Sequence, residues 1–128
     1  MRLAPRDGAA CDALGNLYLQ LGQLDDAVAA LDAGLAATPK TPELYSTLSR
    51  VLGKQGHVSA AIAALQRGVA TLPDQLNLRS DLGAALREAG RTAEARQELE
   101  RGLALARRAN AVEAIARFEQ LLAPPTAR

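Results

Sequence analysis

Residues 41–73 read TPELYSTLSRVLGKQGHVSAAIAALQRGVATLP, and their pattern of glycine, alanine, leucine and proline recurs before and after this stretch. The recurrence has a step of 34 residues, which separates Gly22, Gly56 and Gly90. Five further registers keep the same step: Gly34, Gly68 and Gly102; Ala27, Ala61 and Ala95; Leu31, Leu65 and Leu99; Leu14, Leu48 and Leu82; and Pro5, Pro39 and Pro73. This agreement identifies an internal repeat, and a period of this length is typical of helical solenoids and other repeat architectures.

The repeat resembles the tetratricopeptide family, whose unit reads W-x2-L-G-x2-Y, then A-x3-F, then P. The three units match it as Cys11-x2-Leu14-Gly15-x2-Tyr18, Ala27-x3-Leu31, Pro39; as Tyr45-x2-Leu48-Ser49-x2-Leu52, Ala61-x3-Leu65, Pro73; and as Arg79-x2-Leu82-Gly83-x2-Leu86, Ala95-x3-Leu99. The resemblance covers residues 8–109 and implies an all-α fold, a right-handed α-solenoid of about seven helices in antiparallel A–B pairs. The abundance of Ala, Leu, Arg, Gln and Glu independently favours helix.

The third unit departs from the family pattern at two positions. Arg79 stands where a large aromatic is expected, which predicts looser packing of that repeat. Arg107 stands where the closing proline is expected, so we expect the last repeat to continue differently into the segment that follows.

The predicted organisation follows from these registers. An apolar stripe of Ala111, Ile115, Phe118 and Leu122 at helical spacing predicts a helix that caps the last repeat, because terminal repeats need a polar outer face. The predicted segments are residues 1–7, the tail of a preceding repeat or an N-terminal extension; 8–41, 42–75 and 76–109, repeats 1 to 3; 110–122, the capping helix; and 123–128, a flexible tail.

Several residues mark the expected helix ends. Gly22, Gly56 and Gly90 fall where each A helix should stop, a place where glycine commonly takes a left-handed conformation. The predicted N-caps are Asp7, Thr41 (followed by Pro42 and Glu43), Ser59 and Thr92.

Small residues inside the helices predict close packing. Gly34, Gly68 and Gly102 lie within the B helices, where glycine costs about 1 kcal/mol relative to alanine. We infer that the next A helix crosses closely there, with neutral drift from alanine as the alternative. Ala27, Ala61 and Ala95 are expected at the A–B crossing of each repeat.

Composition excludes several classes of function. The 128 residues hold 15 Lys and Arg against 14 Asp and Glu, which is not the basic surplus of a phosphate-binding protein, so we expect no nucleic-acid partner. No apolar run approaches the roughly 20 residues that span a bilayer, so we expect no membrane insertion. One cysteine and one histidine predict no metal site, and no cofactor is expected. The localisation predicted is cytoplasmic, unless an export signal has been removed.

The family resemblance implies that A helices line a concave groove in which a peptide or protein segment binds. Each candidate is, taken singly, more simply explained as a solvated helix residue, and the set carries the prediction. By register, the groove candidates are Asp12, Asn16, Gln20, Glu43, Ser46, Thr47, Arg50, Lys54, Asn77, Ser80, Asp81, Arg87 and Glu88.

One subset of the family grips the C-terminal carboxylate of heat-shock chaperones with lysine, asparagine and arginine side chains. The matching positions here are Asp12, Asn16, Thr47, Asn77 and Asp81, and only Asn16 agrees with that subset. Two acids in place of two bases would repel a carboxylate, so the sequence predicts that such tails are not bound.

Nothing in the sequence indicates catalysis, and we expect no enzyme. Cys11 lies at the buried aromatic register, His57 in an A–B turn, and Asp25 and Asp26 at a helix start. The leading hypothesis is therefore a protein-interaction scaffold. Two alternatives stay open: self-association through the N-terminal face rich in Ala13, Leu14, Leu17 and Leu21, giving a homo-oligomer, and a substrate-recruiting arm of a larger multidomain enzyme such as a glycosyltransferase.

Overall fold

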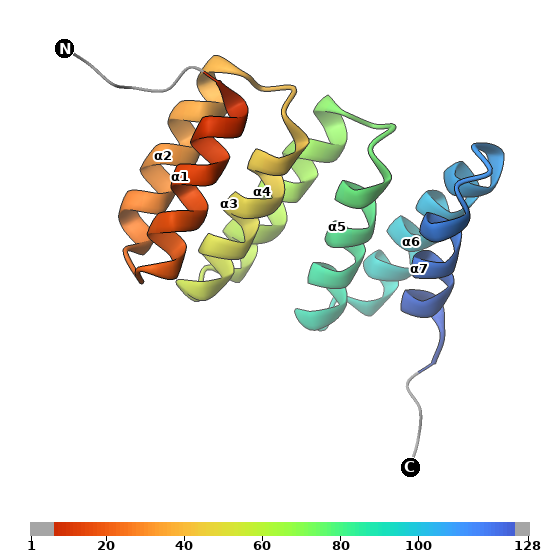
Figure 1. The fold of residues 1–128 in the computed structure, drawn as a ribbon. Helices are drawn as coiled ribbons and strands as arrows, with labels where there is room; N and C mark the ends of the chain where they lie inside the picture. The colour runs from red at the N-terminus through yellow and green to blue at the C-terminus, as the bar shows by residue number, and fades with distance from the viewer. Residues whose placement is uncertain (1–6, 125–128) are drawn as a thin grey trace. The chain divides into compact units, whose positions relative to one another are not determined.

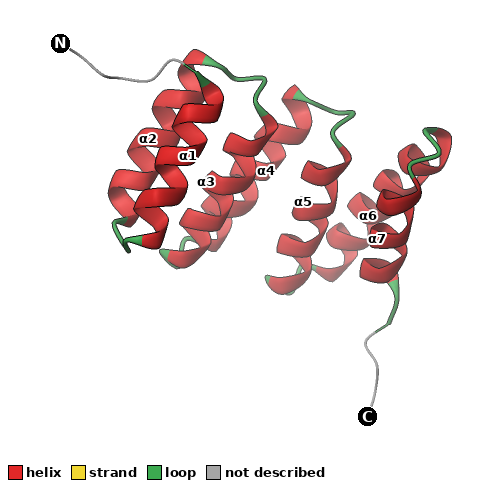
Figure 2. Ribbon diagram, viewed as in Figure 1, coloured by secondary structure: helices red, strands yellow, loops and turns green. Residues whose placement is uncertain are grey.

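The computed structural model describes residues 7–124, which form seven α-helices and no strand. Pro5, most of the predicted segment 1–7 and residues 125–128 of the predicted tail lie outside the described residues. The helices are α1 (Gly8–Gln20), α2 (Leu24–Ala37), α3 (Pro42–Lys54), α4 (Val58–Thr71), α5 (Leu76–Glu88), α6 (Thr92–Arg108) and α7 (Val112–Leu122) (Figure 1). Short loops connect them (Figure 2), and the predicted all-α helical repeat is confirmed.

The chain divides into two compact units, residues 1–72 and 73–128. In the first unit α1 packs on α2 and α3 on α4, and α3 also contacts both helices of the preceding pair. In the second unit α6 packs on α5 and on α7, and α5 contacts α7. Each helix lies inside the repeat segment predicted for it; the segment boundaries themselves remain a prediction.

Three A helices end in the same hydrogen-bonded turn. Gly22, Gly56 and Gly90 have φ values of 76°, 84° and 82°, as predicted. At the first of these turns the Gln23 N–H donates to the Tyr18 carbonyl at 2.9 Å, and the Gly22 N–H donates to the Leu19 carbonyl at 3.1 Å. This is the Schellman pattern, which satisfies helix-end carbonyls and needs a left-handed residue.

The helix starts correct two of the predicted caps. Asp7 does cap α1, since its carboxylate accepts from the Ala9 N–H at 3.1 Å, and Thr41 is the N-cap residue of α3, although its side chain makes no capping bond. Ser59 and Thr92 are wrong, because α4 and α6 begin directly after His57 and Arg91. The residue whose N–H closes the Schellman turn is also the N-cap residue of the next helix. Ser59 and Thr92 therefore already lie within the first turn of their helices.

The loss of proline at position 107 has the expected consequence. Where Pro39 and Pro73 follow, α2 and α4 stop at Ala37 and Thr71, because the residue before a proline is disfavoured in a helix. Helix α6 instead runs to Arg108. A further Schellman turn then follows, with Asn110 at φ 54° in the place that glycine holds elsewhere.

The small residues lie where helices meet. Ala27, Ala61 and Ala95 are buried, and a Cβ added to Gly102 would collide with the ring of Phe118 on α7, which confirms a close crossing by the next helix. A Cβ at Gly34 would lie 2.6 Å from the Cys11 Cβ and 3.2 Å from the Leu44 Cδ1, so this glycine serves its own A helix as well as the next one.

Helix α7 packs against α5 and α6 of the last repeat, and its role as a cap stays a prediction. Phe118 is fully buried against Leu99 and Ala106 of α6, and a ring of partly buried apolar residues surrounds it: Leu76, Leu103, Ala111, Ala114, Ile115, Leu121 and Leu122. Burial of an aromatic side chain of this size supplies a large share of the apolar stabilisation of a small unit.

Arg79 compensates for the missing aromatic with polar contacts. In the second repeat the Tyr45 hydroxyl donates to the Pro39 carbonyl at 2.6 Å. One repeat later the Arg79 Nε donates to the Pro73 carbonyl at 2.8 Å, and the guanidinium also lies 3.8 Å from Glu98. The arginine therefore reproduces the hydrogen bond of the tyrosine that it replaces.

Candidate peptide-binding faces

In the first unit, side chains of α1 and α3 form one hydrogen-bonded row, which we call the α1–α3 face (Asp12, Asn16, Thr47 and Arg50). The Thr47 hydroxyl donates to the Asp12 carboxylate, and the Arg50 Nη2 donates to the Asn16 Oδ1 at 3.0 Å and to the Thr47 Oγ1 at 3.3 Å. Asn16 and Arg50 occupy the same register one repeat apart, so repetition itself places them side by side. These hydrogen bonds hold the Arg50 guanidinium in place in the absence of a ligand.

In the second unit, α5 and α7 carry the equivalent α5–α7 face (Ser80, Asp81, Arg87 and Arg117). The Arg117 Nε donates to the Ser80 Oγ at 3.1 Å, and its Nη2 lies 3.8 Å from the Asp81 carboxylate. The Arg87 Nη1 donates to the Leu121 carbonyl at 2.9 Å. Arginines here tie the capping helix to the last A helix.

Sequence reasoning missed Arg117 as a member of this face. Helix α7 starts at Val112, 36 residues after the start of α5 at Leu76, whereas α5 starts 34 residues after α3. With that two-residue shift Arg117 falls in the register of Thr47 and Asp81. The absent proline at position 107 was the available signal.

The structure separates the predicted groove residues by exposure. Thr47 and Ser80 are each only 2% exposed, so the expectation that they lie open to a ligand is wrong: each hydroxyl is covered by the polar neighbours that it supports. The half-buried candidates are Asp12, Asn16, Ser46 and Asp81. The exposed candidates are Gln20, Glu43, Arg50, Lys54, Asn77, Arg87 and Glu88.

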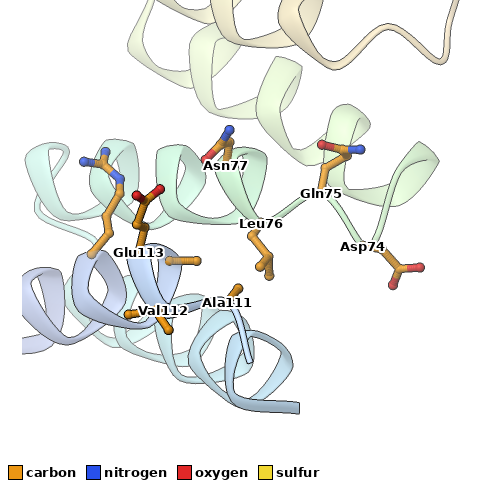
Figure 3. A pocket seen from close by; sticks show the side chains of 9 residues that line it. Asp74, Gln75, Leu76, Asn77, Ala111, Val112 and Glu113 are labelled. Atoms are coloured by element: carbon orange, nitrogen blue, oxygen red, sulfur yellow. The ribbon is translucent and has the colours of Figure 1, made fainter. Parts of the chain in front are cut away.

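An open pocket of about 670 Å³ lies entirely within the second unit, where the α4–α5 loop and the start of α5 face the start of α7. Figure 3 shows the Leu76 side chain directed from α5 toward Ala111, with the carboxylates of Asp74 and Glu113 on opposite sides of this apolar floor. The full lining is Asp74, Gln75, Leu76, Asn77, Ala111, Val112, Glu113, Ala114 and Arg117.

The residues whose chemistry could suggest catalysis lie at separate positions in the fold. Cys11 is buried, His57 is an exposed residue at the start of α4, and Asp25 accepts a hydrogen bond from the Gln55 Nε2 at 2.7 Å. At the start of α6, a hydrogen bond from Arg91 lowers the pKa of Glu94, and the same bond raises the pKa of Arg91. This exposed pair lies outside both faces.

Among residues 7–124, no group of three or more His, Cys, Asp and Glu side chains could hold a metal ion. Within the same range, no helix combines the length and the apolar character that crossing a membrane requires.

Comparison with known proteins agrees with this architecture. Two family models described as tetratricopeptide repeat match residues 1–51 and 46–111. No curated protein sequence matches the chain significantly.

Among solved structures, the TPR2AB domain of yeast Sti1 in complex with pHSP90 superposes with a TM-score of 0.78 at 19% identity, over 92% of this chain and 46% of that one. This chain thus spans less than half of that Sti1 fragment. The Yersinia enterocolitica chaperone SycD, in complex with a peptide of the translocator YopD, gives a TM-score of 0.72 at 19% identity over 89% and 88%. The first TPR of Spaghetti (RPAP3), bound to the HSP90 peptide SRMEEVD, gives 0.67 at 25% identity over 92% and 94%. The Sti1 and SycD likenesses concern the fold alone.

Proposed function

Because the chain belongs to the tetratricopeptide repeat family, we propose that it is a protein-interaction module that binds a peptide or protein segment along its A helices. The module acts by binding and not by catalysis. Similar structures that hold peptides, such as SycD with its YopD peptide and Spaghetti with its HSP90 peptide, support the proposal.

The observation that carries the proposal is the exposure and the hydrogen bonding of the Arg50 guanidinium. Its guanidinium is exposed, is held by Asn16 and Thr47, and forms no ion pair within residues 7–124. An arginine fixed in this way loses little further freedom when it binds, and it offers remaining N–H groups to a carboxylate or a carbonyl. The exposed Lys54 lies one turn further along α3 and adds a second positive charge.

We propose that chaperone C-terminal tails are not the ligand. Spaghetti binds the peptide SRMEEVD, which ends in an acidic residue. Here Asp12 stands in place of a base on the α1–α3 face, and its carboxylate already accepts from Thr47. We expect no saturation when fluorescently labelled SRMEEVD is titrated with the protein; tight, saturable binding would overturn this assignment.

The test of the main proposal is affinity capture from source-cell lysate with the unaltered chain and with an Arg50→Glu, Lys54→Glu variant. The matched control is Lys40→Glu, Arg108→Glu, which changes the net charge by the same amount. Lys40 is exposed between α2 and α3, and Arg108 is exposed at the end of α6. Circular dichroism establishes that both variants are folded. We expect the partner to be lost only with the first variant. A partner that both variants retain equally would place binding elsewhere.

Self-association is a second candidate, and the outer side of α1 favours it. Leu17 is 50% exposed and Leu21 is 60% exposed, whereas Val51, one repeat after Leu17, is fully buried. Among residues 7–124, no side chain covers Leu17 to the extent that the neighbours of α3 cover Val51. A second copy covering it would predict a mass that rises with concentration in sedimentation analysis and falls with Leu17→Gln, Leu21→Gln. A strict monomer at all concentrations would exclude this candidate.

A further inference from the structure

The pocket of the second unit has an apolar floor with polar edges. Leu76 and the alanines Ala111 and Ala114 form part of the floor, and the Val112 side chain beside them is 76% exposed. An exposed valine in a concave site favours an apolar partner side chain. The amides of Gln75 and Asn77 on the lining can pair with the main chain of an extended peptide.

Within residues 7–124, the acidic side chains of the pocket lining lack ion-pair partners, whereas its arginine, Arg117, already has polar partners. Arg117 also lines the pocket, but its guanidinium is engaged by Ser80 at 3.1 Å and by Asp81 at 3.8 Å. The carboxylates of Asp74 and Glu113 have no ion-pair partner among residues 7–124, and they lie on opposite sides of the floor (Figure 3).

From this arrangement we infer that the pocket binds an extended peptide segment in which an apolar side chain lies between two basic ones. This rests on the proposed peptide-binding function and specifies the chemistry of the partner. The apolar side chain packs on Leu76 and Val112, and the ammonium or guanidinium groups meet Asp74 and Glu113. Side chains two residues apart in an extended chain point to the same side, so the motif has the form basic-x-apolar-x-basic.

The probe is the peptide acetyl-Lys-Gly-Leu-Gly-Lys-amide, titrated into the ¹⁵N-labelled full chain while amide chemical shifts are followed. The comparison peptides replace both lysines with norleucine, which keeps the four-carbon side chain of lysine without its charged amino group, or with glutamate. Two exposed ion pairs should lower the Kd of the lysine peptide about fivefold relative to the norleucine peptide. We expect saturable shifts at Asn77, Val112 and Ala114, and no saturation with the glutamate peptide.

The matched variants are Asp74→Asn, Glu113→Gln in the pocket and Asp32→Asn, Glu100→Gln at exposed positions of α2 and α6. The pocket variant should bring the lysine peptide to the affinity of the norleucine peptide, and the control variant should leave the difference intact. Equal binding of the lysine and norleucine peptides, or shifts confined to other surfaces, would overturn the inference. Either result leaves lysate capture through Arg50 and Lys54 unaffected, so failure of this pocket is distinguishable from failure of the proposed function.

Discussion

Three equivalent positions of the second and third repeats hold side chains of different chemistry. These positions hold Tyr45, Ala64 and Arg67 in the second repeat, and Arg79, Glu98 and Arg101 in the third. In the second repeat Tyr45 and Ala64 are 2% and 3% exposed, and the Arg67 Cζ lies 5.9 Å from the tyrosine ring centroid. In the third repeat the side chains of Arg79 and Glu98 are 14% and 19% exposed and lie 3.8 Å apart.

The double substitution Arg79→Tyr, Glu98→Ala transfers the arrangement of the second repeat into the third. Arg101 is already present to lie over the new ring, and the tyrosine hydroxyl can donate to the Pro73 carbonyl as Tyr45 does to Pro39. Replacing a desolvated ion pair with well-packed apolar groups is often neutral or stabilising by about 1–4 kcal/mol. Because this pair keeps some exposure and Glu98 also contacts Arg101 at 3.1 Å, we expect the lower half, about 1–2 kcal/mol.

Each single substitution should destabilise the protein. Glu98→Ala leaves the half-buried Arg79 without its carboxylate, and Arg79→Tyr places a ring beside Glu98, whose Oε1 is already buried without a hydrogen bond. We expect a loss of about 1 kcal/mol for each, and hence a coupling energy of about 3–4 kcal/mol, at or just above the upper end of the usual range for residues in contact. Urea unfolding followed by far-UV circular dichroism measures all four proteins. A double variant less stable than the unaltered chain, or changes that add within about 0.5 kcal/mol, would refute the reasoning.

Three other predictions concern backbone and core. Gly53→Ala should stabilise the protein by about 0.5–1 kcal/mol, because Gly53 lies inside α3 with open space around it. Gly56→Ala should destabilise it by about 1 kcal/mol, because Gly56 has a φ of 84°. Thermal melts of the two variants that shift in the same direction would contradict the turn assignment. Ala61→Leu should lower the melting temperature through an overpacking cost of about 1–3 kcal/mol, and an unchanged melt would tell against its buried position. Phe118→Ala should cost about 3–5 kcal/mol in urea unfolding, and a loss under about 1 kcal/mol would mean that α7 is not the cap of the last repeat.

The parts of the fold that depend on backbone constraints were predictable from the sequence. A left-handed residue is needed to end each A helix, so Gly22, Gly56 and Gly90 located three turns directly. The N-caps were less accessible, because a serine such as Ser59 suits both a cap and the first turn of a helix. Only the hydrogen bond from the His57 N–H to the Leu52 carbonyl shows that the turn closes two residues earlier.

The candidate site was predictable by register and not by exposure. Repetition brought Asn16 beside Arg50, but register alone did not indicate that Thr47 and Ser80 are covered, since burial depends on the side chains of the neighbouring helix. Arg117 escaped because its helix is shifted by two residues: α6 is three residues longer than α4, and the loop that follows it is one residue shorter.

We propose that a partner segment lies along the A helices, and amide hydrogen exchange of the captured complex tests this most directly. We expect slower exchange on partner binding at α1 and α3 of the first unit, centred on the exposed side of Arg50, with α2 and α4 unchanged. Protection confined to α2, α4 and α6, with the A helices exchanging as in the free protein, would contradict it.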